Sequence, residues 1–175
     1  MVDPRYPIGL HVPNENPDSA TLAGWIDQIA AAPEAMRAAV LGLDDEQLDT
    51  PYRERGWTLR QVAHHVPDSH LNAYVRFKLA LTEDEPTIKP YDESLWAELP
   101  DARTGSVEVS VVLLEHLHER WVRLLRAMKP ADFARRFRHP DYGPPVTLAR
   151  TLGMYAWHGR HHPAQITTLR AARGW

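Results

Sequence analysis

The chain of 175 residues contains no cysteine. Disulfide bonds, thiolate-based zinc sites and a thiol nucleophile supplied by the protein are therefore all excluded. No stretch approaches the roughly 18 consecutive apolar residues that a membrane span requires. The start of the chain is rich in proline and lacks the charged-then-apolar profile of a signal peptide, so we expect a cytoplasmic protein without a membrane partner.

A strong charge of one sign is also absent. Twenty Lys and Arg against 23 Asp and Glu leave a net charge of −3, which argues against nucleic acid as a partner. A Gly-rich phosphate loop and a GxSxG nucleophile elbow are missing as well. The composition is that of an ordinary globular protein, with 43% hydrophobic and 25% charged residues, but it includes ten histidines. Any bound metal would therefore be held by imidazoles, with or without carboxylates.

Four long segments show the periodicity of amphipathic helices. Apolar residues recur at helical spacing within residues 19–43, 58–81, 106–128 and 147–172. Thr58 followed by Gln61 is a capping-box pattern that marks a helix start, and Pro33 should kink or divide the first helix. Strand signals are absent, except weakly near the N-terminus. We predict an all-α four-helix bundle in one domain with long crossover connections, preceded by an extended Pro-rich arm at residues 1–18.

The fourth segment carries two histidines on its apolar stripe. His158 and His162 lie four residues apart, so both imidazoles should project from one face and could share a metal ion. His161 points about a quarter turn away. A pair of neutral core histidines with hydrogen-bond partners is the alternative, and it stays open at this point. Because Gly159 follows His158, the glutamate of a HExxH metalloprotease is missing.

The second segment supplies the candidate third ligand. His65 flanks the apolar stripe, whereas His64 lies on a polar and wetter side, so the periodicity favours His65. Ser69, Asn72 and Arg76 follow His65 at helical spacing. They form either a solvated edge or one wall of a cleft that leads from the metal. In the second case we predict Asn72 and Arg76 as substrate-binding residues, with Arg76 holding an anionic group.

Three further residues lie close to the proposed ligands. His118, near the seam of the third segment, is a fourth ligand, a residue behind the ligands or a satisfied core histidine. Pro67 and Pro163 free the carbonyls of Ala63 and Gly159 from their helical partners. Each proline either bends its helix around the core, or opens a cavity and orients an imidazole.

Five segments together resemble the YfiT-type proteins of the DinB superfamily. They are residues 6–9 (YPIG), 57–70 (WTLRQVAHHVPDSH), 72–78 (NAYVRFK), 117–121 (LHERW) and 155–162 (YAWHGRHH). The resemblance implies a four-helix bundle, a cytoplasmic homodimer and a divalent metal whose three ligands fall on His65, His158 and His162. Members are described as metal-dependent hydrolases, and some as bacillithiol S-transferases. Pro67 and Pro163 depart from the smaller residues expected at their positions.

Three neutral nitrogens would leave the charge of the ion uncancelled and a coordination position open, as in catalytic sites. We expect one divalent ion per chain, zinc or nickel, and transfer of a small thiol such as bacillithiol to an electrophilic substrate. The sulfur must arrive on the co-substrate because the chain has no cysteine. The alternatives are a hydrolase that activates water against an amide or ester, and a non-catalytic metal-binding bundle. Asp68, Tyr155 and His161 are candidate general bases, and none of them is favoured.

Overall fold

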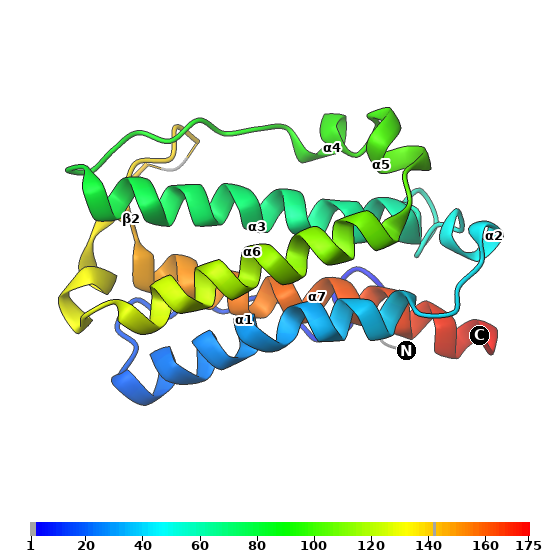
Figure 1. Ribbon diagram of the computed structural model, residues 1–175, viewed down its shortest axis with the longest axis horizontal. Coiled ribbons are helices and arrows are strands. Elements are labelled where there is room, and N and C mark those ends of the chain that lie inside the picture. The colour runs from blue at the N-terminus through cyan, green and yellow to red at the C-terminus, as the bar shows by residue number, and fades with distance from the viewer. Residues whose placement is uncertain (1–2, 142) are drawn as a thin grey trace.

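Four long helices form the body of the computed structural model, which describes residues 3–141 and 143–175 (Figure 1). They are α1 (Ser19–Val40), α3 (Leu59–Thr82), α6 (Val107–Ala127) and α7 (Leu148–Arg173). Helices α1 and α3 each pack against both α6 and α7, so α1 and α3 lie at opposite corners of the bundle. The predicted all-α four-helix bundle is confirmed.

The connections give the bundle an uncommon order of helix directions. In Figure 1, α1 and α7 run toward the right, whereas α3 and α6 run toward the left. Residues 83–106 therefore return along the whole length of the bundle, which is a long crossover of the predicted kind. Two short helices that the sequence did not indicate lie in this connection, α4 (Glu93–Trp96) and α5 (Pro100–Thr104). The Asp92 carboxylate accepts from the Leu95 amide and starts α4, while Pro100 begins α5.

Smaller elements close the two ends of the bundle. They are α2 (Asp45–Leu48), the 3-10 helix η1 (Pro130–Ala134) and the antiparallel pair β1 (Arg136–Phe137) and β2 (Val146–Thr147). This pair follows α6, so the weak strand signal near the N-terminus was misleading. Phe137 and Val146 bury their side chains against the bundle, and packing of two residues leaves no readable pattern in the sequence.

The helix starts follow local capping chemistry. Thr58 Oγ1 accepts from the Gln61 amide, and Gln61 Oε1 accepts from the Thr58 amide, which is the predicted capping box. Three prolines lie inside the long helices, and none of them ends a helix. In particular, α1 continues through the buried Pro33, so of the two expected outcomes, a kink or a division, the division does not occur. Packing of the neighbouring turns offsets the loss of one backbone hydrogen bond.

Residues 3–18 form no helix or strand and run along α7, while residues 1–2 of the predicted arm lie outside the described part. Three polar contacts join the described part of the arm to α7. Gln165 donates to the Arg5 carbonyl, Trp157 Nε1 donates to the Gly9 carbonyl, and Arg150 pairs with Glu15 at 3.0 Å. The arm therefore covers one face of α7 and the side chains that project from it.

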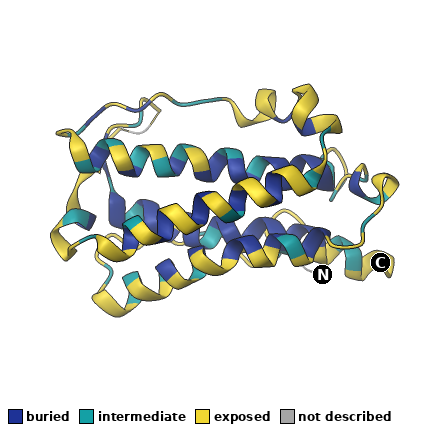
Figure 2. Cartoon of the chain, in the orientation of Figure 1, coloured by how far each residue is buried: buried dark blue, intermediate teal, exposed yellow. Residues whose placement is uncertain are grey.

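The four helices bury the sides that face one another (Figure 2). The buried residues form two apolar clusters, one around Phe77 and Trp121 and the other around Met36 and Leu59. In α3 the buried His70 falls between stretches that contribute to the two clusters, as His118 does in α6. The interior is thus apolar toward both ends and carries imidazoles in its middle.

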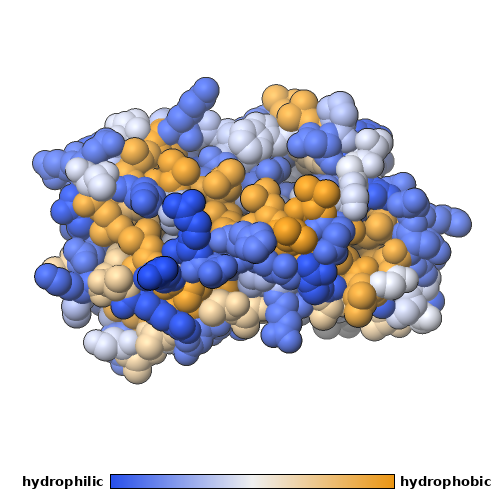
Figure 3. Space-filling model, viewed as in Figure 1, coloured by the Kyte–Doolittle hydropathy of each residue, from blue (hydrophilic) through white to orange (hydrophobic). Residues whose placement is uncertain are grey.

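The outer face of α3 and α6 carries apolar side chains as well, visible as orange patches in Figure 3. The exposed members on these helices are Leu71, Val75, Val109, Val112 and Leu113. None of the helices in the described part of the chain combines the length and apolar character that crossing a membrane would require.

Candidate metal centre

Helices α3 and α7 bring His65, His158 and His162 together in the interior. The three candidate ligand atoms lie within 4.8 Å of one another, and no other such group of His, Asp and Glu occurs among the described residues. His158 Nε2 lies 3.1 Å from His162 Nε2 and 3.3 Å from His65 Nε2. Nitrogens that bind one zinc ion at about 2.0–2.1 Å in a tetrahedral site lie about 3.3 Å apart. The observed spacing therefore suits shared ligation.

Gln165 determines how the His162 ring is protonated. The Gln165 amide nitrogen donates to the Arg5 carbonyl at 3.3 Å, and a carbonyl can only accept. The amide oxygen of Gln165 therefore faces His162 Nδ1, at 2.9 Å, and accepts its proton. In the neutral ring this leaves a lone pair on His162 Nε2, directed at the centre.

A row of three histidines determines the protonation of His158 in the same way. His118 Nδ1 lies 2.7 Å from the Ile29 carbonyl and must donate to it, which leaves His118 Nε2 as an acceptor. His70 Nδ1 donates to that nitrogen at 2.8 Å. His158 Nδ1 then donates to His70 Nε2 at 3.0 Å. His158 Nε2 therefore also carries a lone pair directed at the centre.

Two lone pairs thus face each other across 3.1 Å, between His158 Nε2 and His162 Nε2, with no hydrogen to share. Burial disfavours relief by protonation, because it lowers the pKa of His65 to about 4 and those of His158 and His162 well below their ordinary value. A cation accepts both lone pairs at once. The donor set therefore fits a divalent ion that prefers imidazole nitrogen.

A cavity of about 600 Å³ opens beside these imidazoles, and all three line it. This volume falls within the range of small-molecule sites. The other lining residues come from the arm, the segment just before α3, α3, the 83–106 connection, the segment before α7 and α7 itself: His11, Pro13, Trp57, Ser69, Arg76, Pro90, Tyr91, Glu93, Phe137, His139, Asp141, Val146, Arg150, Thr151, Met154 and Tyr155. A small molecule in this cavity could reach an ion held by the histidines.

The two predicted substrate residues have different positions. Arg76 lines the cavity together with His65 and Ser69, so these side chains of α3 form one wall. Asn72 is not a lining residue, and its amide nitrogen donates to the Asp68 carbonyl one turn earlier. Sequence reasoning missed Arg150, which also lines the cavity and pairs with Glu15 of the arm.

The remaining histidines near the site are not in the cluster of three. His64 is buried, not on a wetter side as predicted, because Ser110 Oγ at 2.6 Å and the Gly105 carbonyl at 3.1 Å cover its two nitrogens. His118 lies behind the cluster as a partner of His70, and His116 is exposed as expected. His161 stacks on Trp157 with ring centroids 4.2 Å apart.

Two further residues of the site, His70 and Gln165, lie at helical spacing from other site or core residues. His70 lies four residues after the buried Val66 and three before the buried Ala73, so its place on the apolar stripe of α3 was readable. Gln165 lies three residues after His162, within reach on the same helix face. Its hydrogen bond to the arm could not be read, because the arm has no periodicity.

The candidate general bases are also separated by the structure. Tyr155 lines the cavity, whereas Asp68 and His161 do not. Burial raises the pKa of Asp68 to about 6, and nearby Asp101 adds to this effect. Of the three candidate bases, only Tyr155 therefore borders the space that a small molecule would fill.

Known proteins resemble this chain in sequence and in architecture. The sequence profile of the DinB superfamily matches residues 28–166. The chain belongs to the DinB superfamily. Within this superfamily, a protein of Bacillus mycoides named "Putative metal-dependent hydrolase" is 52% identical over 175 residues, which is 100% of both chains. A Bacillus cereus protein with the same description is 53% identical over the same length, again 100% of both chains.

Two solved structures share the fold of this DinB superfamily chain. YfiT from Bacillus subtilis, described as a probable metal-dependent hydrolase with an unusual four-helix bundle topology, is 47% identical and covers 98% of each chain with a TM-score of 0.95. TT2238, a four-helix bundle protein, is 21% identical, with a TM-score of 0.58 over 89% of this chain and 100% of its own. The second likeness concerns the fold alone.

Proposed function

We propose that this DinB superfamily chain is a metal-dependent enzyme that transfers a low-molecular-weight thiol of the bacillithiol type to an electrophilic small molecule. His65, His158 and His162 would hold one divalent ion, zinc or nickel. The observation that carries the proposal is the pair of unprotonated nitrogens facing each other at 3.1 Å on the wall of the cavity. When bound, such an ion supplies Lewis acidity, which lowers the pKa of a thiol or water that reaches it.

Arg76 would bind an anionic group of the thiol. Arg76 lines the cavity, and none of the hydrogen bonds and ion pairs among the described residues involves its guanidinium side chain. Such a group suits bidentate recognition of a carboxylate. Tyr91 lies in the same cavity, and burial raises its pKa to about 12, so its hydroxyl stays protonated and can donate. Direct substrate contact by Asn72 stays a prediction.

Trp57 would shield the metal-facing imidazoles from bulk water. Its ring lies against His65 with ring centroids 4.8 Å apart, and it lines the cavity. A partly apolar wall strengthens the electrostatic attraction between a cation and an incoming anion. Such a wall would favour an anionic nucleophile that loses its hydration shell when it binds the ion.

Hydrolysis is the second candidate, and the names of the relatives, which are described as metal-dependent hydrolases, favour it. Water would then take the place of the thiol, and Arg76 would bind the amide or ester substrate instead. Thiol transfer would use the cavity of about 600 Å³, whose volume falls within the range of small-molecule sites, and Arg76 on its wall would bind the anionic thiol. The homodimer stays a prediction.

One preparation separates these reactions. Zinc-loaded and nickel-loaded protein is assayed for conjugation of bacillithiol to an electrophilic fluorophore, and for hydrolysis of activated esters and amides. We expect conjugation that His65→Ala abolishes, and an Arg76→Ala variant whose KM for the thiol rises about tenfold. An unchanged KM would remove Arg76 from the proposal. Hydrolysis alone would establish the second candidate, and tight metal binding without turnover would establish a binding module.

A further inference from the structure

Three histidines from three different helices form a continuous row of hydrogen bonds through the bundle. His118, His70 and His158, called the histidine row below, are 2%, 0% and 6% exposed. His118 belongs to α6, His70 to α3 and His158 to α7. The row starts at α1 and ends at the candidate metal centre, although only its last member is a candidate ligand.

Pro33 explains why the row can start at α1. Proline has no N–H, so residue 33 cannot donate to the carbonyl of Ile29, its normal helical partner. That carbonyl is therefore free to accept from His118 Nδ1, at 2.7 Å. A carbonyl oxygen has no proton to give, so the direction of this first hydrogen bond is fixed.

The fixed direction passes along the whole row. A neutral imidazole has one donor and one acceptor, so a ring that donates through Nδ1 must accept through Nε2. His70 therefore donates to His118 at 2.8 Å, and His158 donates to His70 at 3.0 Å. Reversing either bond would place two donors or two acceptors against each other in a dry interior. All three rings are buried, and a dry interior favours the uncharged form of an imidazole.

The packing around His70 holds its ring in one orientation. Trp121 and Tyr155 lie edge-on to it, with ring centroids 5.8 and 5.1 Å away and interplanar angles of 86° and 88°. Gly159 packs closely against the same ring. A Cβ at this position would lie 3.4 Å from His70 Cε1 and only 2.8 Å from Ala32 Cβ. His70 therefore has little freedom to turn away from His158.

We propose that His118 and His70 are positioning residues of the metal centre, which hold His158 in its Nδ1–H form and direct the Nε2 lone pair at the ion. The inference rests on the proposed metal site. The three candidate ligands then differ in the hydrogen-bond partner of Nδ1, the ring nitrogen that faces away from the centre. Gln165 orients His162, the histidine row orients His158, and no hydrogen bond reaches His65 Nδ1 from any described residue.

The first test needs neither metal nor activity. Long-range ¹H–¹⁵N correlation spectra of the metal-free, ¹⁵N-histidine-labelled protein report which ring nitrogen carries the proton. We expect His118, His70 and His158 all in the Nδ1–H form, with Nδ1 protons that exchange slowly with solvent. A His158 ring protonated at Nε2, or one that averages between both forms, would overturn the proposal.

The second test measures zinc affinity by competition with a chromophoric chelator. His118→Phe removes the acceptor of His70 Nδ1, and His70→Leu removes the acceptor of His158 Nδ1. We expect each to weaken zinc binding about 10- to 100-fold, the usual effect of losing a partner behind a ligand. His70→Gln should stay within about threefold of the unmodified protein, because its amide can accept from His158 and donate to His118.

His116→Phe is the matched control, since His116 lies on the same helix as His118 but is exposed. It should leave zinc affinity unchanged. Equal zinc binding by His118→Phe and the unmodified protein would refute the inference and leave the metal site intact. An unmodified protein that binds no zinc would refute both. If the Phe and Leu variants do not fold, the spectra of the unmodified protein decide.

Discussion

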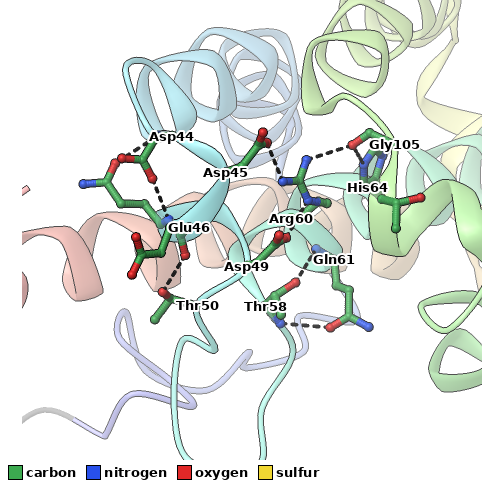
Figure 4. A network of polar contacts seen from close by, with 12 residues as sticks. Asp44, Asp45, Glu46, Asp49, Thr50, Thr58, Arg60, Gln61, His64 and Gly105 are labelled. Atoms are coloured by element: carbon green, nitrogen blue, oxygen red, sulfur yellow. Dashed lines mark hydrogen bonds and ion pairs between the residues drawn. The ribbon is translucent and has the colours of Figure 1, made fainter.

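Two neighbouring residues of α3, His64 and His65, belong to two polar clusters of opposite character. His64 is part of a network, shown in Figure 4, in which every hydrogen bond joins a donor to an acceptor. We call it the Arg60 network, and its members are Asp45, Asp49, Arg60, His64, Gly105 and Ser110. His65 instead meets two other imidazoles, nitrogen to nitrogen.

The Arg60 network is complete within the protein. The Arg60 guanidinium donates to Asp49 at 2.6 Å, to Asp45 at 2.7 Å and to the Gly105 carbonyl at 3.0 Å. His64 reaches the same carbonyl with Nε2. These bonds tie α2, the start of α3 and the end of α5 together where the chain leaves the long connection. The network therefore holds the fold and has no need of a ligand.

The histidine cluster is incomplete without a cation. His158 Nε2 and His162 Nε2 present lone pairs to each other, and both orientations are imposed from behind by other residues. A protein that needed only stability would avoid such a contact, since apolar side chains of the same size would pack without conflict. The comparison shows what distinguishes a structural polar cluster from a ligand site. In the Arg60 network every donor meets an acceptor, whereas in the histidine cluster two acceptors face each other and need a cation.

The largest expected effect distinguishes the two adjacent histidines. His65→Ala should lower zinc affinity by at least about 100-fold, since it removes a ligand, whereas His64→Ala should leave affinity within about threefold. His64→Ala should instead lower the free energy of unfolding by about 1–3 kcal/mol, because it leaves buried partners unpaired. Chelator competition and urea unfolding of both variants measure this. Similar losses of zinc affinity in both variants would mean that the clusters are not independent.

Acid should destabilise the metal-free protein through its buried imidazoles. Burial lowers the pKa of His118 and of His65 to about 4 in the folded state, from an ordinary value of about 6.5. The unfolded chain therefore takes up protons first, so this stability is fully present above about pH 6.5 and is lost as the pH falls toward 4. Asp68 has the opposite effect on stability. Burial raises its pKa to about 6, so the folded protein binds this proton more tightly than the unfolded chain, and acid favours folding at this residue.

Urea unfolding of the metal-free protein at pH 7 and pH 5 measures this loss. An Arg60→Met variant should show the same difference between the two values, because arginine stays charged throughout. A free energy of unfolding that does not change between pH 7 and pH 5 would contradict the assignment of neutral buried histidines.

The smallest expected effect on zinc binding is that of replacing Arg60 itself. Arg60→Met keeps the apolar stem and removes the donors to Asp49 and to the Gly105 carbonyl, so we expect a loss of about 1–3 kcal/mol in the free energy of unfolding. Bound zinc per chain, measured by elemental analysis, should stay the same. A variant that folds normally but has lost its zinc would show that the Arg60 network supports the site as well as the scaffold.

Local chemistry made most of the fold predictable. The starts of α3 and α7 follow from Thr58 and Thr147, whose hydroxyls accept from backbone amides three residues later. The four long helices followed from apolar spacing, because each buries one face against two neighbours. The two short helices of the long connection and the β1–β2 pair did not follow, because so few residues carry no periodic signal.

The sequence by itself determined that imidazoles are the candidate ligands, since the chain has no cysteine, and that His158 and His162 share a helix face because four residues complete about one turn. The direction of the hydrogen bonds behind them was decided only by the tertiary structure. Ile29, His118 and His70 come from three helices, and no spacing along the chain reveals that a carbonyl freed by Pro33 faces an imidazole of α6. Long-range packing alone brings those atoms together, and it thereby fixes where the proton on His158 lies.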